Sequence, residues 1–296
     1  MVRTFAAIDV GSFELEMGIY EISEKTGVRS IDHVKHMIAL GKDTFEDGKI
    51  SYQMVEETCR VLKDFASIMK GYQVNEYRAY ATTAMREAKN SQIVLEQIRV
   101  RTGIQVKVLS NSEQRFIRYK AIAIKASEFQ KTIQKGTAIA DVGFGSMQAS
   151  VFDKDSLIST QNLPLGVLKL RQILTHAKLS AQAEQSLVME LIDNELLTFR
   201  KMYLKDREIK HLIAIGDPIL TMYYKLNGIT RSDRLTAEKF NSFFEWMRTK
   251  TRAQLEDAFD VNGEYASMMF PTVAIYKRML EVTGAEILWV PGIRMA

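Results

Sequence analysis

The sequence predicts an α/β protein of two lobes, each built on the same core. The triplet Asp-Val-Gly occurs twice, at 9–11 and 141–143, each time after a short run of Ala and Ile. The order of predicted strands and helices that begins at the first triplet starts again at the second. A chain of 296 residues with 46% hydrophobic content also exceeds the size above which chains tend to divide into domains.

The first half predicts the order βββαβαβα. Apolar runs separated by Gly and polar turns over 4–41 predict a meander of three strands. Apolar residues at helical spacing predict a helix over 51–70, with Ser51 as its N-cap. The next helix should end at Gly103. The remaining strand, helix, strand and helix of this half are expected at 76–82, 91–103, 104–110 and 113–129.

The second half restarts with a strand, a Gly turn and two further strands over 137–166. Amphipathic patterns predict the long helices that follow, and two short apolar runs predict strands. The helices are expected at 180–205, 236–258 and 264–283, and the strands at 211–216 and 285–290. We therefore divide the chain into an N-terminal lobe over 1–125 and a C-terminal lobe over 126–296.

Composition narrows the class of protein. A net charge of +4 is too small to indicate nucleic-acid binding, and no apolar run approaches the roughly 20 residues that cross a bilayer. The single cysteine, Cys59, excludes an internal disulfide and indicates a reducing compartment, and its place on an apolar helix face predicts buried packing. The start of the chain does not resemble a secretory signal, so we expect a cytoplasmic protein.

The two Asp-Val-Gly turns have the chemistry of a phosphate site. Glycine lets backbone N–H groups approach an anion closely, and serine hydroxyls add donors. An aspartate at the end of a strand suits a hydrated Mg²⁺ ion. A lone triplet is a common turn, but its duplication favours two hairpins that face each other across a cleft and clamp a polyphosphate chain. The expected phosphate-binding residues are Gly11, Ser12, Gly143, Gly145 and Ser146, and the expected metal ligands are Asp9 and Asp141.

Five segments, in order along the chain, resemble the motifs of one known protein family. "AIDVGSFE" resembles the family's Asp-x-Gly-Ser-Asn-Ser opening, and "ATTAMREAKN" resembles its Ala-Thr-Ser-Ala-x-Arg-x-Ala-x-Asn segment, with specific matches at Arg86, Ala88 and Asn90. The segments "LSNSEQRF", "DVGFGSMQ" and "LPLGVLKL" resemble Ile-Ser-Gly-x-Glu-Glu-Ala-Arg, Asp-Ile-Gly-Gly-Gly-Ser-Thr-Glu and Leu-Pro-Leu-Gly-x-x-x-Leu. In these motifs the chain resembles the exopolyphosphatase and guanosine pentaphosphate phosphohydrolase (Ppx/GppA) family of the actin, sugar kinase and Hsp70 (ribonuclease H-like) fold.

The resemblance implies hydrolysis of the terminal phosphoanhydride of inorganic polyphosphate or of a guanosine alarmone, with Mg²⁺ and with a homodimer as a possible assembly. It implies that Arg86 offsets charge on the transferred phosphoryl group and that Asp141 serves metal and water. The family's water-activating carboxylate comes from a Glu-Glu pair, which falls on Glu113 and Gln114 here.

The sequence departs from the family where the chemistry should occur. Gln114 replaces the water-activating Glu, and a neutral amide does not accept a proton from water. The adjacent Glu113 has a capping-box spacing from Ser110, so it is open to a structural or a catalytic role. Further departures are expected to weaken phosphate or metal binding by bulk, by lost carboxylates or by added negative charge. They are Phe13, Glu14, Phe144, Gln148 and Pro218.

These losses, with the fold signals intact, predict a catalytically degenerate family member that binds polyphosphate or a phosphorylated nucleotide between its lobes. The alternative is an active Mg²⁺-dependent hydrolase in which Glu14, Glu16 or Glu113 supplies a relocated carboxylate. No metal site is expected at His33 and His36, because residues three apart on a strand face opposite sides.

Overall fold

The computed structural model describes residues 2–25, 27–125, 129–177, 179–230 and 234–292. Contacts divide the chain into two units, the first ending at Ile117 and the second beginning at Arg118. This division falls within helix α5 (Asn111–Lys125). The lobe boundary expected between residues 125 and 126 borders residues outside the described part, and it stays a prediction.

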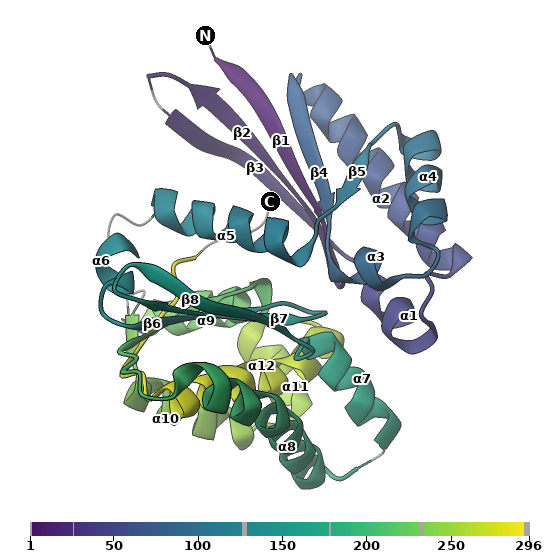
Figure 1. The fold of residues 1–296 in the computed structure, drawn as a ribbon. Coiled ribbons are helices and arrows are strands. Elements are labelled where there is room, and N and C mark those ends of the chain that lie inside the picture. The colour runs from purple at the N-terminus through teal and green to yellow at the C-terminus, as the bar shows by residue number, and fades with distance from the viewer. Residues whose placement is uncertain (1, 26, 126–128, 178, 231–233, 293–296) are drawn as a thin grey trace. The chain divides into compact units, whose positions relative to one another are not determined.

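The first unit is a five-stranded sheet with the order β3-β2-β1-β4-β5 (Figure 1). Strand β2 pairs antiparallel with both β1 and β3, so the meander predicted at the N-terminus is confirmed, and β1 also pairs parallel with β4. The strands are β1 (Arg3–Val10), β2 (Glu14–Ser23), β3 (Gly27–Met37), β4 (Glu76–Ala81) and β5 (Val106–Val108). Besides the start of α5, the helices are α1 (Leu40–Asp47), α2 (Tyr52–Gly71), α3 (Thr83–Glu87) and α4 (Ser91–Thr102).

Local signals set the helix ends of this unit. Ser51 accepts a hydrogen bond from the Met54 N–H and caps α2, as predicted. Gly103 has the left-handed conformation and ends α4, as predicted. Cys59 on α2 is fully buried in the core between these helices and the sheet, which confirms its packing role. The short helices α1 and α3 were not predicted.

The second unit repeats the strand order of the first and adds one edge strand. Its sheet has the order β10-β11-β9-β6-β7-β8, in which β6 pairs antiparallel with β7 and parallel with β9. The core of the chain is therefore duplicated, as the sequence predicted. The strands are β6 (Thr137–Val142), β7 (Met147–Asp153), β8 (Ser156–Leu163), β9 (His211–Ile215), β10 (Arg234–Thr236) and β11 (Ile287–Trp289).

The helices of the second unit correct the sequence-based prediction in several places, and those over Phe129–Ile133 and Val167–Ala177 were not predicted. The predicted helix over 236–258 is two helices, because Thr249 bonds back to Trp246 and Thr251 forms a capping box that starts a new helix. A helix that was not predicted, α9, follows β9. The helices are α6 (Phe129–Ile133), α7 (Val167–Ala177), α8 (Ala181–Phe199), a π-helical turn η1 (Arg200–Leu204), α9 (Asp217–Thr230), α10 (Ala237–Arg248), α11 (Arg252–Phe259) and α12 (Gly263–Thr283).

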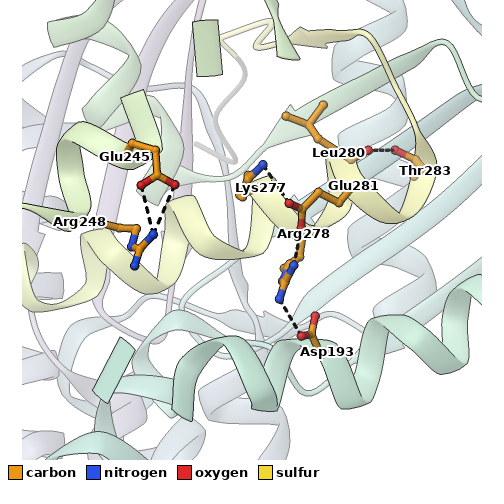
Figure 2. Close-up of polar contacts among 8 residues, drawn as sticks. All are labelled: Asp193, Glu245, Arg248, Lys277, Arg278, Leu280, Glu281 and Thr283. Atoms are coloured by element: carbon orange, nitrogen blue, oxygen red, sulfur yellow. Dashed lines mark hydrogen bonds and ion pairs between the residues drawn. The ribbon is translucent and has the colours of Figure 1, made fainter. Parts of the chain in front are cut away.

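Helix α12 is the central helix of the second unit. It buries Tyr276, whose hydroxyl donates to the Ile215 carbonyl at 2.6 Å at the end of β9. Figure 2 shows its polar side, where Arg278 contacts Asp193 of α8 at 2.8 Å and Glu281 at 2.6 Å. These contacts fix α12, and with it the end of β9, beside the second Asp-Val-Gly turn. None of the helices in the described ranges is long and apolar enough to cross a membrane.

Candidate phosphate-binding turns

The two Asp-Val-Gly turns have the same hydrogen-bonding pattern. In the first, the Gly11 N–H donates to the Glu14 carbonyl at 3.0 Å. In the second, the Gly143 N–H donates to the Ser146 carbonyl at 2.9 Å. Both glycines directly follow the first strand of a hairpin, so the sequence repeat is a repeat of backbone geometry.

The position opposite each aspartate differs between the two hairpins. Asp9 pairs with Glu16 across β1 and β2, and Asp141 pairs with Gln148 across β6 and β7. All of these side chains are buried. In the described residues neither polar atom of the Gln148 side chain has a hydrogen-bond partner. The second turn therefore has an amide where the first has a carboxylate.

Ser12 anchors the first turn to the rest of its unit. Its hydroxyl oxygen accepts the Ala84 N–H at 3.1 Å at the start of α3, and its carbonyl accepts the Gly41 N–H at 2.6 Å. Because a hydroxyl can accept and donate at once, the Ser12 proton can still be donated to a ligand.

Lysine and histidine from β3 offset the carboxylates of the first turn. Lys35 Nζ lies 2.5 Å from Glu14 Oε2 and 3.3 Å from Glu16 Oε1. His33 Nε2 lies 3.6 Å from Glu16 Oε2, whereas His36 points to the other side of the strand, toward Glu57. The opposite orientation of the two histidines was predicted. The negative charge expected from Glu14 is partly offset by Lys35, whose single positive charge is shared between Glu14 and Glu16 and was not predicted from the sequence.

Arg86 and Gln114 lie together in the first unit. One Arg86 nitrogen donates to the Leu109 carbonyl at 2.7 Å and to Gln114 Oε1 at 3.5 Å, and another donates to Thr83 Oγ1 at 3.0 Å. Burial lowers the pKa of Arg86 from its usual value, although an arginine remains charged at neutral pH. The residue expected to offset phosphoryl charge therefore contacts Gln114, which was expected to take the place of the family's catalytic carboxylate.

Glu113 forms the capping box that its spacing suggested. Its Oε2 accepts the Ser110 N–H at 2.9 Å, the Glu113 N–H donates to Ser110 Oγ at 3.2 Å, and Lys107 Nζ donates to Oε1 at 2.6 Å. These donors, Lys107 foremost, lower the pKa of Glu113 to about 2. A carboxylate with so low a pKa is a weak base, so the geometry favours the structural role.

Replacing Glu113 with glutamine should reduce stability slightly at neutral pH and leave any phosphate release unchanged. Because folding lowers the pKa from 4.5 to about 2, the stabilising contribution is complete above pH 4.5 and is lost as the pH falls toward 2. Melting temperatures of wild type and variant should therefore converge between these pH values. Glu76→Gln, at an exposed strand position, is the matched control, and a loss of turnover in Glu113→Gln alone would contradict the structural role.

The second turn rests on close backbone packing. Phe144, which was expected to add bulk at this turn, is buried against the Tyr265 ring of α12, and its effect on phosphate binding stays a prediction. Gly166 lies against Gly145, and a Cβ at Gly166 would come within 2.1 Å of the Gly145 carbonyl carbon. The Leu-Pro-Leu-Gly segment therefore needs glycine at 166, because any side chain there would overlap the backbone of the turn.

A buried arginine, which the sequence analysis missed, faces the second aspartate. Arg118 Nε lies 3.5 Å from Asp141 Oδ2, and Arg118 Nη2 lies 3.7 Å from Asp217 Oδ2. Burial and the nearby carboxylates of Asp141 and Asp217 raise the pKa of Tyr276 well above its usual value, so its hydroxyl stays protonated. A helical spacing of four residues from Gln114 was the available signal for Arg118.

Pro218 lies at the start of α9, and its expected effect on phosphate binding stays a prediction. It is the second residue of α9, where backbone N–H groups have no partner within the helix, so the missing donor leaves the helix intact. The preceding Asp217 lies in the first helical turn, where the helix dipole stabilises a negative charge.

The groups around the two aspartates can be compared with what a magnesium ion requires. Within the described ranges, no group of three or more His, Cys, Asp or Glu side chains could hold a metal ion. Mg²⁺ binds oxygen ligands at about 2.0–2.1 Å in octahedral geometry. Asp141 instead contacts a guanidinium, and the first turn contains Lys35 next to two carboxylates. At Asp141 the metal that the resemblance implies does not fit, because the Arg118 guanidinium already lies beside this carboxylate, whereas a metal at Asp9 stays a prediction.

Comparison with known proteins defines the class. The Ppx/GppA phosphatase family model matches residues 19–288, and the chain belongs to this family. A family member from Aquifex aeolicus has a solved structure that aligns with a TM-score of 0.76 and 21% identity over 98% of this chain and 94% of that one. An exopolyphosphatase structure from Cytophaga hutchinsonii aligns with a TM-score of 0.81 and 16% identity over 97% and 93%. These likenesses establish the fold.

Two curated relatives match this chain over less than half of their own length. Exopolyphosphatase 1 of Mycobacterium tuberculosis is 24% identical over 163 residues, which are 55% of this chain and 46% of that protein. The guanosine-5'-triphosphate,3'-diphosphate pyrophosphatase of Photobacterium profundum is 25% identical over 159 residues, which are 52% of this chain and 31% of that protein. The chain thus spans less than half the length of either relative.

Proposed function

We propose that the protein binds a phosphate-rich ligand, either polyphosphate or a guanosine alarmone, and does not hydrolyse it appreciably. Membership of the Ppx/GppA family and the repeated turns support the ligand class. The glycine N–H of each turn is used within the turn, so a serine hydroxyl and the N–H groups of the residues after the glycine are the donors suited to phosphate oxygens. A cytoplasmic location, a homodimer and the absence of nucleic-acid binding remain predictions.

One observation supports the loss of catalysis most strongly. Gln114 Oε1 lies where Arg86 donates to it, at the place where the family has the carboxylate that activates water. The neighbouring carboxylate, Glu113, is held by Lys107 and Ser110 instead. Phosphoryl transfer needs a group that orients or deprotonates the attacking water. The side chain that contacts Arg86 at this position is the amide of Gln114, and an amide cannot deprotonate water.

The residues that remain suit binding. Arg86 carries a charge at a partly buried position and can approach phosphate oxygens through its guanidinium. Ser12 and Ser146 are buried at turns whose backbone is fixed by hydrogen bonds within each unit. When bound, Mg²⁺ would neutralise charge on the phosphates themselves, as is usual in phosphoryl-transfer sites.

The alternative is an active Mg²⁺-dependent exopolyphosphatase or guanosine pentaphosphate phosphohydrolase with a relocated carboxylate. Glu16 favours it, because it is buried and lies directly across from Asp9. However, Lys35 and His33 contact both of its oxygens. A carboxylate between two basic groups is a weaker base, so we rank this function second.

The test is to heat the whole protein with and without long-chain sodium polyphosphate and to measure free phosphate in the same samples. We expect the ligand to raise the melting temperature, because it binds the native state, while phosphate stays at the level of protein-free samples. A monovalent salt at equal ionic strength is the control. Sustained phosphate release would favour the second function, and no shift with polyphosphate or with the guanosine alarmone would refute the proposed ligand class.

A further inference from the structure

The charged groups around Asp141 point to a different electrostatic arrangement from a metal site. Arg118 lies between Asp141 and Asp217, with one nitrogen within 3.5 Å and another within 3.7 Å of a carboxylate oxygen. Its side chain is 4% exposed, so the pair interacts through little solvent. Close, buried charges of opposite sign interact strongly, and removing one leaves the other uncompensated.

Asp141 and Asp217 both lie next to positive charge that the protein itself provides. Asp217 is the first residue of the 14-residue helix α9, so the helix N-terminus adds to the effect of the guanidinium. Asp141 has Arg118. The neighbouring group on β7 is the neutral amide of Gln148 rather than a second carboxylate. A divalent cation at Asp141 would therefore meet carboxylates that already share the Arg118 guanidinium, and it would lie beside that positive charge.

We propose that Arg118 is a fixed cation that replaces a divalent metal at Asp141, so that the Gly143–Ser146 turn binds a phosphate-rich ligand without Mg²⁺. This inference rests on the proposed function and specifies its cofactor requirement. Arg118 acts by positioning and neutralising Asp141, which would otherwise repel phosphate oxygens from the turn. The first turn has a parallel feature, because Lys35 contacts Glu14 and Glu16.

Metal dependence of binding tests the inference. The dissociation constant of long-chain polyphosphate is measured by calorimetry in EDTA and in excess Mg²⁺. For wild type we expect the two constants to agree within about three-fold, because metal and ligand are not coupled at this turn. Binding that is at least about ten-fold tighter with Mg²⁺ would overturn the inference and leave the proposed function intact. Absence of binding in both buffers would overturn the proposed function.

A direct metal titration decides the inference even if polyphosphate does not bind. Mn²⁺ is the probe, since it shares the oxygen preference of Mg²⁺ and its free form is measured by its paramagnetic signal. We expect the wild-type protein and the Asp141→Asn variant to bind the same amount of Mn²⁺, because Asp141 is not a metal ligand. A stoichiometric site lost in Asp141→Asn would overturn the inference.

Variants at Arg118 provide the matched controls. Arg118→Gln alone leaves two buried carboxylates without their cation and is prone to misfolding. Arg118→Gln combined with Asp217→Asn keeps the net charge of the cluster unchanged, and we expect it to gain a Mn²⁺ site and to bind polyphosphate about ten-fold more tightly with Mg²⁺ than in EDTA. Arg118→Lys keeps the cation and should remain metal-independent. A double variant with the wild-type profile would contradict the role of Arg118.

Discussion

Replacing Gly216 with alanine should lower the free energy of unfolding by about 4 kcal/mol, which combines backbone strain with steric overlap. Gly216 joins β9 to α9 with a φ of +129°, a conformation that side chains disfavour. A Cβ there would also lie 2.0 Å from the Val142 carbonyl oxygen, directly after Asp141. Relieving the overlap moves the end of β6, so polyphosphate binding should weaken as well.

Two other glycines separate the causes of this loss. Gly71, at the end of α2, has open space around it and should accept alanine with little effect or a slight gain. Gly284 has a φ of +70° but nothing within 4 Å, so Gly284→Ala isolates the backbone strain. Urea unfolding should rank the losses as Gly216, Gly284 and Gly71. Equal losses at Gly216 and Gly284 would show that contact with Val142 is unimportant.

Replacing Gln114 with glutamate should raise phosphate release from polyphosphate by about 100-fold or more, the usual scale for a positioned general base. The two side chains have nearly the same size, so the fold should tolerate the change. The new carboxylate would face Arg86, which now donates to Gln114 at 3.5 Å. A nearby cation keeps a carboxylate ionised at neutral pH, the form that can orient or deprotonate water.

The control for this variant is Gln97→Glu, which adds the same charge at an exposed position of α4. It should leave phosphate release at the wild-type level. If Gln114→Glu binds polyphosphate but stays inert, the missing chemistry lies elsewhere, with Gln148 as the next position to restore.

The fold was largely predictable because its strongest signals are local. The strand order repeats because each Asp-Val-Gly hairpin starts the same sequence of elements, and both hairpins formed as expected. Helix α9 was missed because its apolar start continues the run of β9 and Pro218 suggested a turn. The break between α10 and α11 depends on side-chain bonds of Thr249 and Thr251, which helical periodicity does not reveal.

The candidate site was predictable only where its residues are close in the sequence. The turn glycines, their serines and the capping box of Glu113 follow from local spacing. Arg118, Lys35 and the buried position of Phe144 depend on which elements pack together, so single-segment patterns did not identify them. These tertiary contacts change the interpretation of the two expected metal ligands. Asp141 forms an ion pair with Arg118, and Asp9 lies across from Glu16, which forms an ion pair with Lys35.

The most direct test of the central claim is steady-state phosphate release by the wild-type protein with long-chain polyphosphate and Mg²⁺. The claim that Gln114 leaves the protein without its water-activating carboxylate predicts release at the level of protein-free samples, while polyphosphate still raises the melting temperature. Repeated turnover by wild type, abolished by Glu16→Gln, would contradict it and show that a relocated carboxylate performs the hydrolysis.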